Sequence, residues 1–174
     1  MPATGNQNER ARHYNFTGIS GTALGSVAAA MAERGYVITG SDENVYPPMS
    51  TFLEGKGISI SSGFRPENIL AGTDVVVIGN AMSRGNEEVE AVLDRKLLYT
   101  SLPEVLKNEF LRGRRNLVVT GTHGKTTTSS MLAHLLKFND RDPGHMIGGI
   151  PRDLGQGCRF TDSEFFVLEG DEYD

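Results

Sequence analysis

The stretch Val118–Ser130, VVTGTHGKTTTSS, has the residue types of a phosphate-binding loop. An apolar run enters a glycine turn, and Gly-Lys-Thr then opens a run of small hydroxyl residues. In such a loop, backbone N–H groups surround the phosphate oxygens, the lysine reaches the β and γ phosphates, and the next hydroxyl contacts Mg²⁺. The pattern predicts a nucleotide site formed by Gly121, Thr122, His123, Gly124, Lys125, Thr126 and Thr127.

This loop differs at one position from the common form G-x-x-x-x-G-K-[ST], which has a glycine where this chain has Val119. The alternative interpretation is a glycine turn that starts a helix and binds nothing. Gly-Lys-Thr between a strand and a helix argues against that alternative. His123 lies inside the loop, where either its ring or only its backbone could face a ligand.

A second glycine turn comes earlier, between the first predicted strand and the first predicted helix. Its spacing is G-x-x-G-x-x-x-G, and glycines there allow a ligand to approach a helix N-terminus that favours anions. Asp42 follows the next strand, where a ribose-binding carboxylate falls in a Rossmann unit. A diphosphate or nucleotide site is one interpretation, and a plain tight turn with a solvated Asp42 is the other. The candidate residues are Gly18, Ser20, Gly21, Thr22, Ala23, Leu24 and Asp42.

The segment Glu164–Asp174, EFFVLEGDEYD, contains another apolar run, Phe165–Leu168, with carboxylates at the C-terminal end of that run. Ligands bind at the C-terminal ends of parallel strands, and magnesium prefers oxygen ligands. Glu169 is therefore a candidate metal ligand, with a solvated acidic loop as the alternative. Cys158 is interpreted as a passive thiol, and His13, His134 and His145 are assigned no role.

The elements that must position these residues alternate between short apolar runs and helix-like stretches, which predicts an α/β fold with a parallel sheet. Strands are expected at Tyr14–Thr17, Tyr36–Thr39, Ile58–Ile60, Asp74–Ile78, Leu97–Tyr99, Leu117–Thr120 and Phe165–Leu168. Helices are expected at Thr22–Arg34, Met49–Lys56, Asn86–Lys96 and Lys125–Phe138, and from Pro103 with the Ser101 side chain as cap. We predict a flexible leader over residues 1–11, a Rossmann-like domain over 12–111 and a second α/β unit over 112–174.

The composition argues against several classes of protein. The chain has 174 residues and a net charge of −5, which argues against a nucleic-acid binder. A single cysteine excludes an internal disulfide and a zinc site made of cysteines. Because no apolar run reaches the roughly 18 residues of a membrane span, we expect a cytoplasmic protein with no membrane partner. The sequence leaves the oligomeric state open.

Five motifs together resemble the Mur ligase family, the ATP-dependent amide-forming enzymes of bacterial cell-wall synthesis. They are FTGISGTALG, TGSDENVYPP, GNAMSRGNEEVEAVL, TGTHGKTTT and EGDEYD. The resemblance covers nearly the whole chain after residue 12. The family's own nucleotide loop lacks the earlier glycine, so Val119 fits it. Gly170 stands where these ligases usually have alanine, a departure that leaves Glu169 in place.

The resemblance implies a UDP-binding Rossmann-like domain followed by the start of a P-loop ATPase central domain, with ATP and Mg²⁺ as cofactors. It implies that Gly121–Thr127 hold ATP, that Lys125 is catalytic because it stabilises the transferring phosphoryl charge, and that Thr126 and Glu169 hold Mg²⁺. Gly18–Leu24 and Asp42 would hold the UDP part of the acceptor, UDP-N-acetylmuramate. NVYPPMST and GNAMSRGN look closest to the branch that adds L-Ala-γ-D-Glu-meso-diaminopimelate. GTHGKTTT resembles the branch that adds L-alanine.

Family members have three domains, and this chain holds the first and the opening part of the second. We therefore expect the chain alone not to ligate, and we expect residues after about 140 to be poorly ordered or to pair with another chain. Two other classes stay open: a non-catalytic module that binds a nucleotide sugar, and a nicotinamide-dependent oxidoreductase. The glycine spacing and the second phosphate loop weaken the oxidoreductase.

Overall fold

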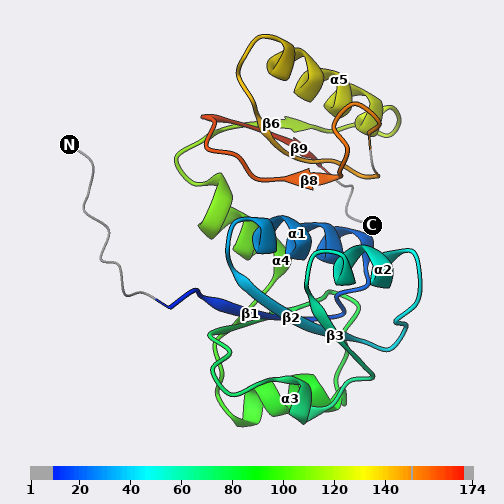
Figure 1. Cartoon of the computed structure of the whole chain (residues 1–174), viewed down its shortest axis with the longest axis vertical. Coiled ribbons are helices and arrows are strands. Elements are labelled where there is room, and N and C mark those ends of the chain that lie inside the picture. The colour runs from blue at the N-terminus through cyan, green and yellow to red at the C-terminus, as the bar shows by residue number, and fades with distance from the viewer. Residues whose placement is uncertain (1–9, 150, 171–174) are drawn as a thin grey trace, which may run out of the picture.

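The computed structural model describes residues 10–149 and 151–170. Two β-sheets lie one above the other with a layer of helices between them, and each sheet carries a further helix on its outer face (Figure 1). The order through the molecule is α5, second sheet, α1 with α2 and α4, first sheet, and α3 (Figure 1). The central helices therefore contact both sheets.

The first sheet is parallel throughout, with strand order β3-β2-β1-β4-β5. The chain runs outward from β1 to β3 on one side, then returns to add β4 and β5 on the other. The change of direction puts a crevice at the carboxyl ends of β1 and β4, where ligands bind in open α/β sheets. The strands are β1 (His13–Thr17), β2 (Val37–Asp42), β3 (Ser59–Ser62), β4 (Val75–Ile78) and β5 (Tyr99–Thr100).

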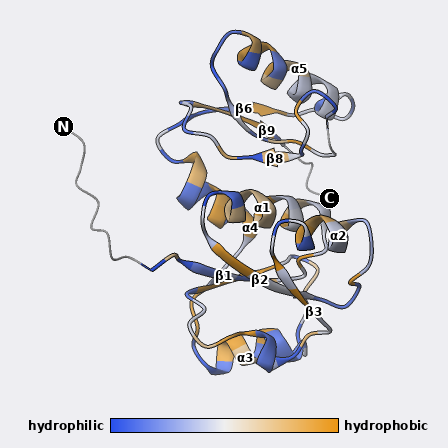
Figure 2. Ribbon diagram, in the orientation of Figure 1, coloured by the Kyte–Doolittle hydropathy of each residue, from blue (hydrophilic) through white to orange (hydrophobic). Residues whose placement is uncertain are grey.

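The helices of this first unit cover both faces of the sheet. They are α1 (Thr22–Glu33), α2 (Met49–Glu54), the 3-10 turn η1 (Pro66–Asn68), α3 (Glu87–Asp94), α4 (Leu102–Val105) and the π-helical segment η2 (Leu106–Leu111). In Figure 2, α1 is largely hydrophobic, whereas α3 carries a polar outer face and β1 contains hydrophilic residues. β1 is nevertheless buried along its whole length, so His13, Asn15 and Thr17 are buried polar residues.

Close packing of α1 on the sheet requires glycine at two positions. A Cβ at Gly25 would lie 2.7 Å from the Met49 sulfur and 2.9 Å from the Ile19 carbonyl oxygen. A Cβ at Gly40 on β2 would lie 2.7 Å from Ile19 Cδ1. The third glycine of the G-x-x-G-x-x-x-G turn therefore lets the helix pack closely, as the last glycine of a Rossmann turn does.

The second sheet is mixed, with order β6-β9-β7-β8. β9 pairs in parallel with both β6 and β7, whereas β8 is antiparallel to β7. The elements are β6 (Arg115–Val119), α5 (Lys125–Phe138), β7 (Gly144–Met146), β8 (Cys158–Arg159) and β9 (Phe165–Glu169). Sequence analysis did not predict β7 and β8, since each is only two or three residues long.

The expectation of disorder after residue 140 was wrong for the described residues. Cys158, Phe160 and Phe166 belong to the same buried cluster as α1 and β1. Phe160 stacks on Phe110 with ring centroids 3.5 Å apart. These late strands are ordered because α1 already presents an apolar face for them to cover.

Polar contacts join the two units at the same place. Arg34 on α1 forms an ion pair with Asp162 at 2.7 Å. Arg114 donates to the carbonyl oxygens of Thr161 and Ser163, at 2.6 and 2.9 Å. The short loop after β8 is thus held to the first unit by both stacking and hydrogen bonds.

Other predicted details were corrected by the structure. Ser101 is the N-cap of α4, but its side chain makes no capping hydrogen bond. β2 runs to Asp42, beyond the predicted end at Thr39. Of the predicted leader, residues 1–9 lie outside the described residues, whereas Arg10 donates to Asp74 at 2.8 Å. The last four residues of the EGDEYD segment, 171–174, also lie outside them. Within the described residues, no helix is long and apolar enough to cross a membrane.

Candidate functional site

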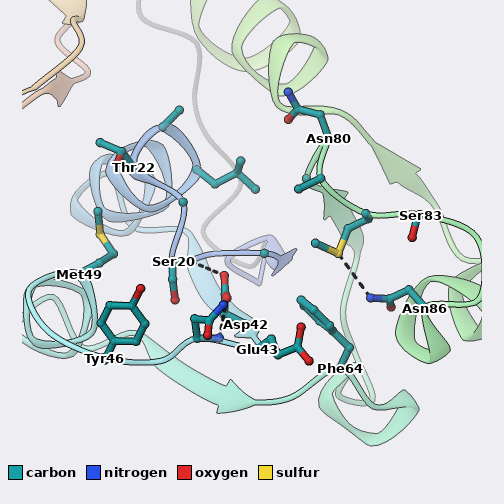
Figure 3. Close-up of a pocket in the computed structure, with 18 of the residues that line it drawn as sticks. Ser20, Thr22, Asp42, Glu43, Tyr46, Met49, Phe64, Asn80, Ser83 and Asn86 are labelled. Atoms are coloured by element: carbon teal, nitrogen blue, oxygen red, sulfur yellow. Dashed lines mark hydrogen bonds between the residues drawn. The ribbon is translucent and has the colours of Figure 1, made fainter.

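A cavity of about 1200 Å³ opens at the carboxyl ends of β1 and β4, where the strand order of the first sheet reverses (Figure 3). Its walls come from the turn before α1, the segment after β2, and the segment between β4 and α3. All the residues predicted for the first glycine turn line it: Gly18, Ser20, Gly21, Thr22, Ala23, Leu24 and Asp42. The structure therefore brings that whole set together in one place.

The first glycine turn is held in shape by its own backbone. The N–H groups of Gly18 and Ile19 donate to the Ser41 carbonyl oxygen at 2.8 and 3.1 Å, and Gly18 has φ +88°. Within the described residues, the N–H groups of Thr22, Ala23 and Leu24 donate to no acceptor. These three groups form the first turn of α1, and that helix end has no side-chain cap and no acidic residue. They suit an anion.

Asp42 holds two segments of the cavity wall together. One carboxylate oxygen accepts from the Ser20 N–H at 2.9 Å, and the other accepts from the Asn44 N–H at 2.9 Å (Figure 3). The carboxylate faces the cavity, and each oxygen has a second lone pair. Asp42 can therefore shape the turn and also accept from a ligand hydroxyl.

A buried carboxylate below the cavity escaped the sequence analysis. Glu88 is fully buried and accepts from Thr17 Oγ1 at 2.8 Å and Ser41 Oγ at 2.6 Å. It also accepts from the Asn68 side chain at 2.8 Å and the Arg65 N–H at 3.3 Å. Glu88 thus ties α3 to the ends of β1 and β2. A glutamate in the first turn of a helix is usually exposed to solvent, so the sequence did not predict that Glu88 is buried.

The opposite cavity wall also went unpredicted. It consists of the segment 79–86, with Asn80, Ser83 and Asn86 across the cavity from Thr22 (Figure 3). Two aromatic residues, Tyr46 and Phe64, line the floor and side. The motif GNAMSRGN was the only sequence signal for this wall.

The second glycine turn links β6 to α5. Gly121 has φ +136° and Gly124, the N-cap of α5, has φ +76°. Lys125 Nζ donates to the Gly121 carbonyl oxygen at 2.7 Å, so the lysine folds back over the loop. Among the described residues, the N–H groups of Thr122, His123, Gly124, Thr126 and Thr127 donate to no acceptor.

Thr126 and Glu169 lie together, as the metal prediction requires. Thr126 Oγ1 donates to Glu169 Oε1 at 2.8 Å, and the Gly148 N–H donates to the other carboxylate oxygen at 2.7 Å. Both side chains offer oxygen, which magnesium prefers, and two protein ligands are normal for a magnesium ion that also binds phosphates. Within the described residues, no group of three or more His, Cys, Asp or Glu side chains is placed to hold a metal ion. Thr126 and Glu169 fit Mg²⁺ that is bound together with a nucleotide.

His123 lies within the second glycine turn, and its side chain is exposed. The two other titratable candidates, His145 and Cys158, line neither the large cavity nor the second turn. His145 is buried with Nε2 3.0 Å from the Gln156 carbonyl oxygen, and burial lowers its pKa. Burial raises the pKa of the Cys158 thiol well above its usual value, as expected of a passive cysteine.

A small apolar cavity of about 120 Å³ adjoins the large one. Thr22, Pro48 and Met49 line both cavities, and Gly149 also lines the small one. Gly149 follows Gly148, whose N–H donates to Glu169. The first glycine turn and the loop that contacts Glu169 therefore both contribute residues to one small cavity between the sheets.

Comparisons with known proteins agree with this arrangement. A family model described as "Mur ligase family, catalytic domain" matches residues 13–114, and one described as "Mur ligase middle domain" matches residues 119–165. The chain is 48% identical over 163 residues to a UDP-N-acetylmuramate--L-alanyl-gamma-D-glutamyl-meso-2,6-diaminoheptandioate ligase of Haemophilus influenzae, covering 94% of this chain and 36% of that protein. It is 36% identical over 165 residues to a UDP-N-acetylmuramate--L-alanine ligase of Dictyoglomus turgidum, covering 94% of this chain and 35% of that protein.

Among solved structures, the chain is similar to a UDP-N-acetylmuramate:L-alanyl-gamma-D-glutamyl-meso-diaminopimelate ligase of Neisseria meningitides. That match has 42% sequence identity and a TM-score of 0.88, and it covers 95% of this chain and 54% of the other. The chain spans about a third of the length of the curated relatives it matches.

Proposed function

The chain belongs to the Mur ligase family, and from that premise we propose that it forms the nucleotide-sugar and ATP sites of a ligase. The reaction joins L-Ala-γ-D-Glu-meso-diaminopimelate to UDP-N-acetylmuramate with consumption of ATP. The observation that carries the proposal is that the chain holds both a large cavity at the free N–H groups of α1 and a phosphate loop whose Thr126 contacts Glu169.

In the proposed acceptor site, the diphosphate of UDP-N-acetylmuramate lies at the N-terminus of α1. The N–H groups of Thr22, Ala23 and Leu24 donate to its oxygens, and the helix dipole adds partial positive charge. Asp42 accepts from a ribose hydroxyl while its backbone hydrogen bonds keep it in place. The sugar then extends toward the small cavity beside Gly149.

In the proposed ATP site, the N–H groups of Gly121–Thr127 surround the phosphates. Lys125 leaves the Gly121 carbonyl oxygen and donates to the transferring phosphoryl group, whose negative charge it stabilises. Thr126 and Glu169 hold Mg²⁺, which neutralises charge on the phosphate oxygens when it is bound. Positioning and electrostatics supply most of the catalysis in phosphoryl transfer.

The proposed chemistry has two balanced steps. A carboxylate oxygen of the muramate attacks the γ-phosphorus of ATP, and the bond to ADP breaks. The amine of the incoming peptide then attacks the acyl carbon, inorganic phosphate leaves with the bonding pair, and the ammonium proton is lost to solvent.

Sequence similarity favours the tripeptide over L-alanine as amine substrate, at 48% identity against 36%. We place the protein in the cytoplasm, where ATP and nucleotide sugars are made. Because we expect the chain alone not to ligate, the test uses a ligase of its relatives' full length that contains this chain. Supplied with ATP, UDP-N-acetylmuramate and equal amounts of both amines, it should yield the tripeptide product, as read by mass spectrometry. A product containing only L-alanine would make the L-alanine ligase the correct assignment.

Calorimetric titration tests the binding part of the proposal. We expect the chain to bind UDP-N-acetylmuramate and ATP with Mg²⁺, and not NAD. Heat with NAD and none with the nucleotide sugar would instead support an oxidoreductase. Binding of the nucleotide sugar without any response to ATP would support a non-catalytic binding module.

A further inference from the structure

The charged side chains that line the large cavity are mostly acidic. Asp42 and Glu43 line it, and among the described lining residues Arg84 is the only cation. Both oxygens of Asp42 already accept from backbone N–H groups. A doubly charged anion in this cavity would therefore meet one mobile positive charge, on the wall opposite α1.

The backbone that carries Arg84 is anchored at its start. The Gly79 N–H donates to the Thr17 carbonyl oxygen at 3.0 Å, which fixes the segment to the end of β1. The Met82 N–H then donates to the Gly79 carbonyl oxygen at 3.1 Å. Arg84 thus follows a turn that is bonded directly to the sheet.

The segment is anchored equally well on the other side of Arg84. The Gly85 N–H donates to Glu90 Oε1 at 3.0 Å, and the Asn86 side chain caps α3 by accepting from the N–H groups of Glu88 and Val89. Gly85 has φ +85°, which favours glycine and turns the chain sharply after Arg84. The position of the Arg84 backbone is therefore set by β1 and α3 together.

This wall approaches the first glycine turn closely. A Cβ at Gly18 would lie 3.3 Å from the Met82 methyl carbon. Figure 3 shows Ser83 on the side of the cavity that faces Ser20 and Thr22. Arg84, the next residue, lines the same cavity as the N-terminus of α1.

The Arg84 side chain is exposed and makes no hydrogen bond or ion pair with the described residues. The other arginines of the first unit that lie near acids are paired: Arg10 with Asp74, and Arg12 with Glu109. A guanidinium carries several N–H donors in a planar fork that matches phosphate oxygens, and it is always charged.

Resting on the proposed function, we propose that Arg84 binds the diphosphate of the nucleotide sugar from the side opposite α1. Backbone N–H groups hold one face of the diphosphate, and the guanidinium neutralises the other. Arg84 acts as a binding and positioning residue and takes no part in bond making.

Titration calorimetry of Arg84→Gln with three ligands tests this assignment. With UDP and with UDP-N-acetylmuramate we expect an affinity loss of roughly tenfold to a hundredfold, since a charge-assisted bidentate contact is lost. With uridine, which has no phosphate, we expect no change. Arg84→Lys should recover part of the loss, because it restores the charge without the fork.

The matched control is Arg112→Gln. Arg112 is also exposed and makes no side-chain hydrogen bond or ion pair with the described residues, but it lies at the end of η2, away from the cavity. The control has the same change in net charge, so it should bind UDP as the unmodified chain does. Equal losses in both variants would attribute the effect to net charge and overturn the proposal.

The result also separates this inference from the proposed function. If the unmodified chain binds no UDP ligand, the proposed function fails. If the unmodified chain binds UDP and Arg84→Gln binds it equally well, only the role of Arg84 fails. A loss confined to UDP-N-acetylmuramate, with UDP unaffected, would mean that Arg84 contacts the muramate and would also overturn the proposal.

Discussion

Each glycine turn joins a strand to a helix, but the two turns differ in which of their groups already contact the protein. In the first, Gly18 and Ile19 donate to the sheet, and the free N–H groups face a cavity of about 1200 Å³. In the second, Lys125 contacts the Gly121 carbonyl oxygen and Thr126 contacts Glu169. The first turn offers fixed backbone donors, whereas in the second the functional side chains contact the protein itself.

The difference indicates two binding modes. A ligand at the first turn meets preformed backbone geometry, which loses little conformational entropy on binding. A ligand at the second turn must replace the contacts of Lys125 and Thr126 with its own oxygens and a metal ion. Substitutions at the two turns should therefore affect different ligands, and the predictions below run from the largest effect to the smallest.

Lys125→Met should have the largest effect. We expect ATP affinity in the presence of Mg²⁺ to fall on the order of a hundredfold, because a charged hydrogen bond to the phosphates is lost. The affinity for UDP-N-acetylmuramate should not change. Lys137→Met, in the last turn of the same helix, is the matched control. A similar loss of ATP affinity in that control would contradict the role of Lys125.

The variants Gly25→Ala and Gly124→Ala show how much each glycine contributes to the free energy of unfolding. A Cβ at Gly25 meets Met49 and Ile19 below van der Waals distance, so we expect a loss of about 1–3 kcal/mol from overpacking. At Gly124 the space is open, and only φ +76° is unfavourable for alanine, at about 1–2 kcal/mol. Urea unfolding measures both. If Gly25→Ala were as stable as the unmodified chain, α1 would not be packed as described.

Glu169→Gln tests the metal assignment. The amide keeps an oxygen for Thr126 but loses the negative charge, so we expect the Mg²⁺-dependent part of ATP affinity to fall about tenfold. ATP affinity without Mg²⁺ should stay the same. Glu164→Gln, at the start of the same segment, serves as the control. An equal loss with and without Mg²⁺ would show that Glu169 supports the loop and not the ion.

Asp42→Asn should weaken UDP-N-acetylmuramate binding by roughly three- to tenfold, since one of its two acceptor oxygens becomes a donor that faces an N–H group. ATP affinity should not change. Calorimetry with both ligands measures the effect. An equal loss of affinity for both ligands would contradict the assignment of the two turns to different ligands.

Acid should destabilise the chain through His145. Burial lowers its pKa below the ordinary value of 6.5, so below that pH the unfolded chain binds more protons than the folded chain. The free energy of unfolding should therefore fall as pH decreases through about 6.5. Burial lowers the pKa of His13 as well, which acts in the same direction. His145→Gln should reduce this pH dependence, whereas His123→Gln should keep it; identical curves for all three proteins would contradict the assignment.

The sequence predicted the parts of the fold that depend on local pattern. α5 has the predicted bounds, Lys125–Phe138, because Gly-Lys-Thr marks its start and Asn139 its end. The strands β1 and β4 were found within one residue of their predicted starts. β4 is a continuous apolar run, and β1 ends at the glycine turn that begins with Gly18. The residues of the first turn were also predicted to act together, and they share one cavity.

Features that depend on long-range packing could not be predicted. Glu88 is an ordinary helix glutamate in sequence, and only the folded sheet surrounds it with donors. The strand β8 has two residues, and it is ordered because α1 covers it. The same holds for Asp42, which accepts from the Ser20 N–H only when β1 and β2 are paired.

The central claim is that the two turns bind two different ligands. Its most direct test is a titration of the chain with UDP-N-acetylmuramate, followed by a titration of the saturated complex with ATP and Mg²⁺. We predict one binding event of equal stoichiometry in each step, with the nucleotide sugar retained throughout. Displacement of the nucleotide sugar by ATP, or absence of the first binding event, would contradict the account.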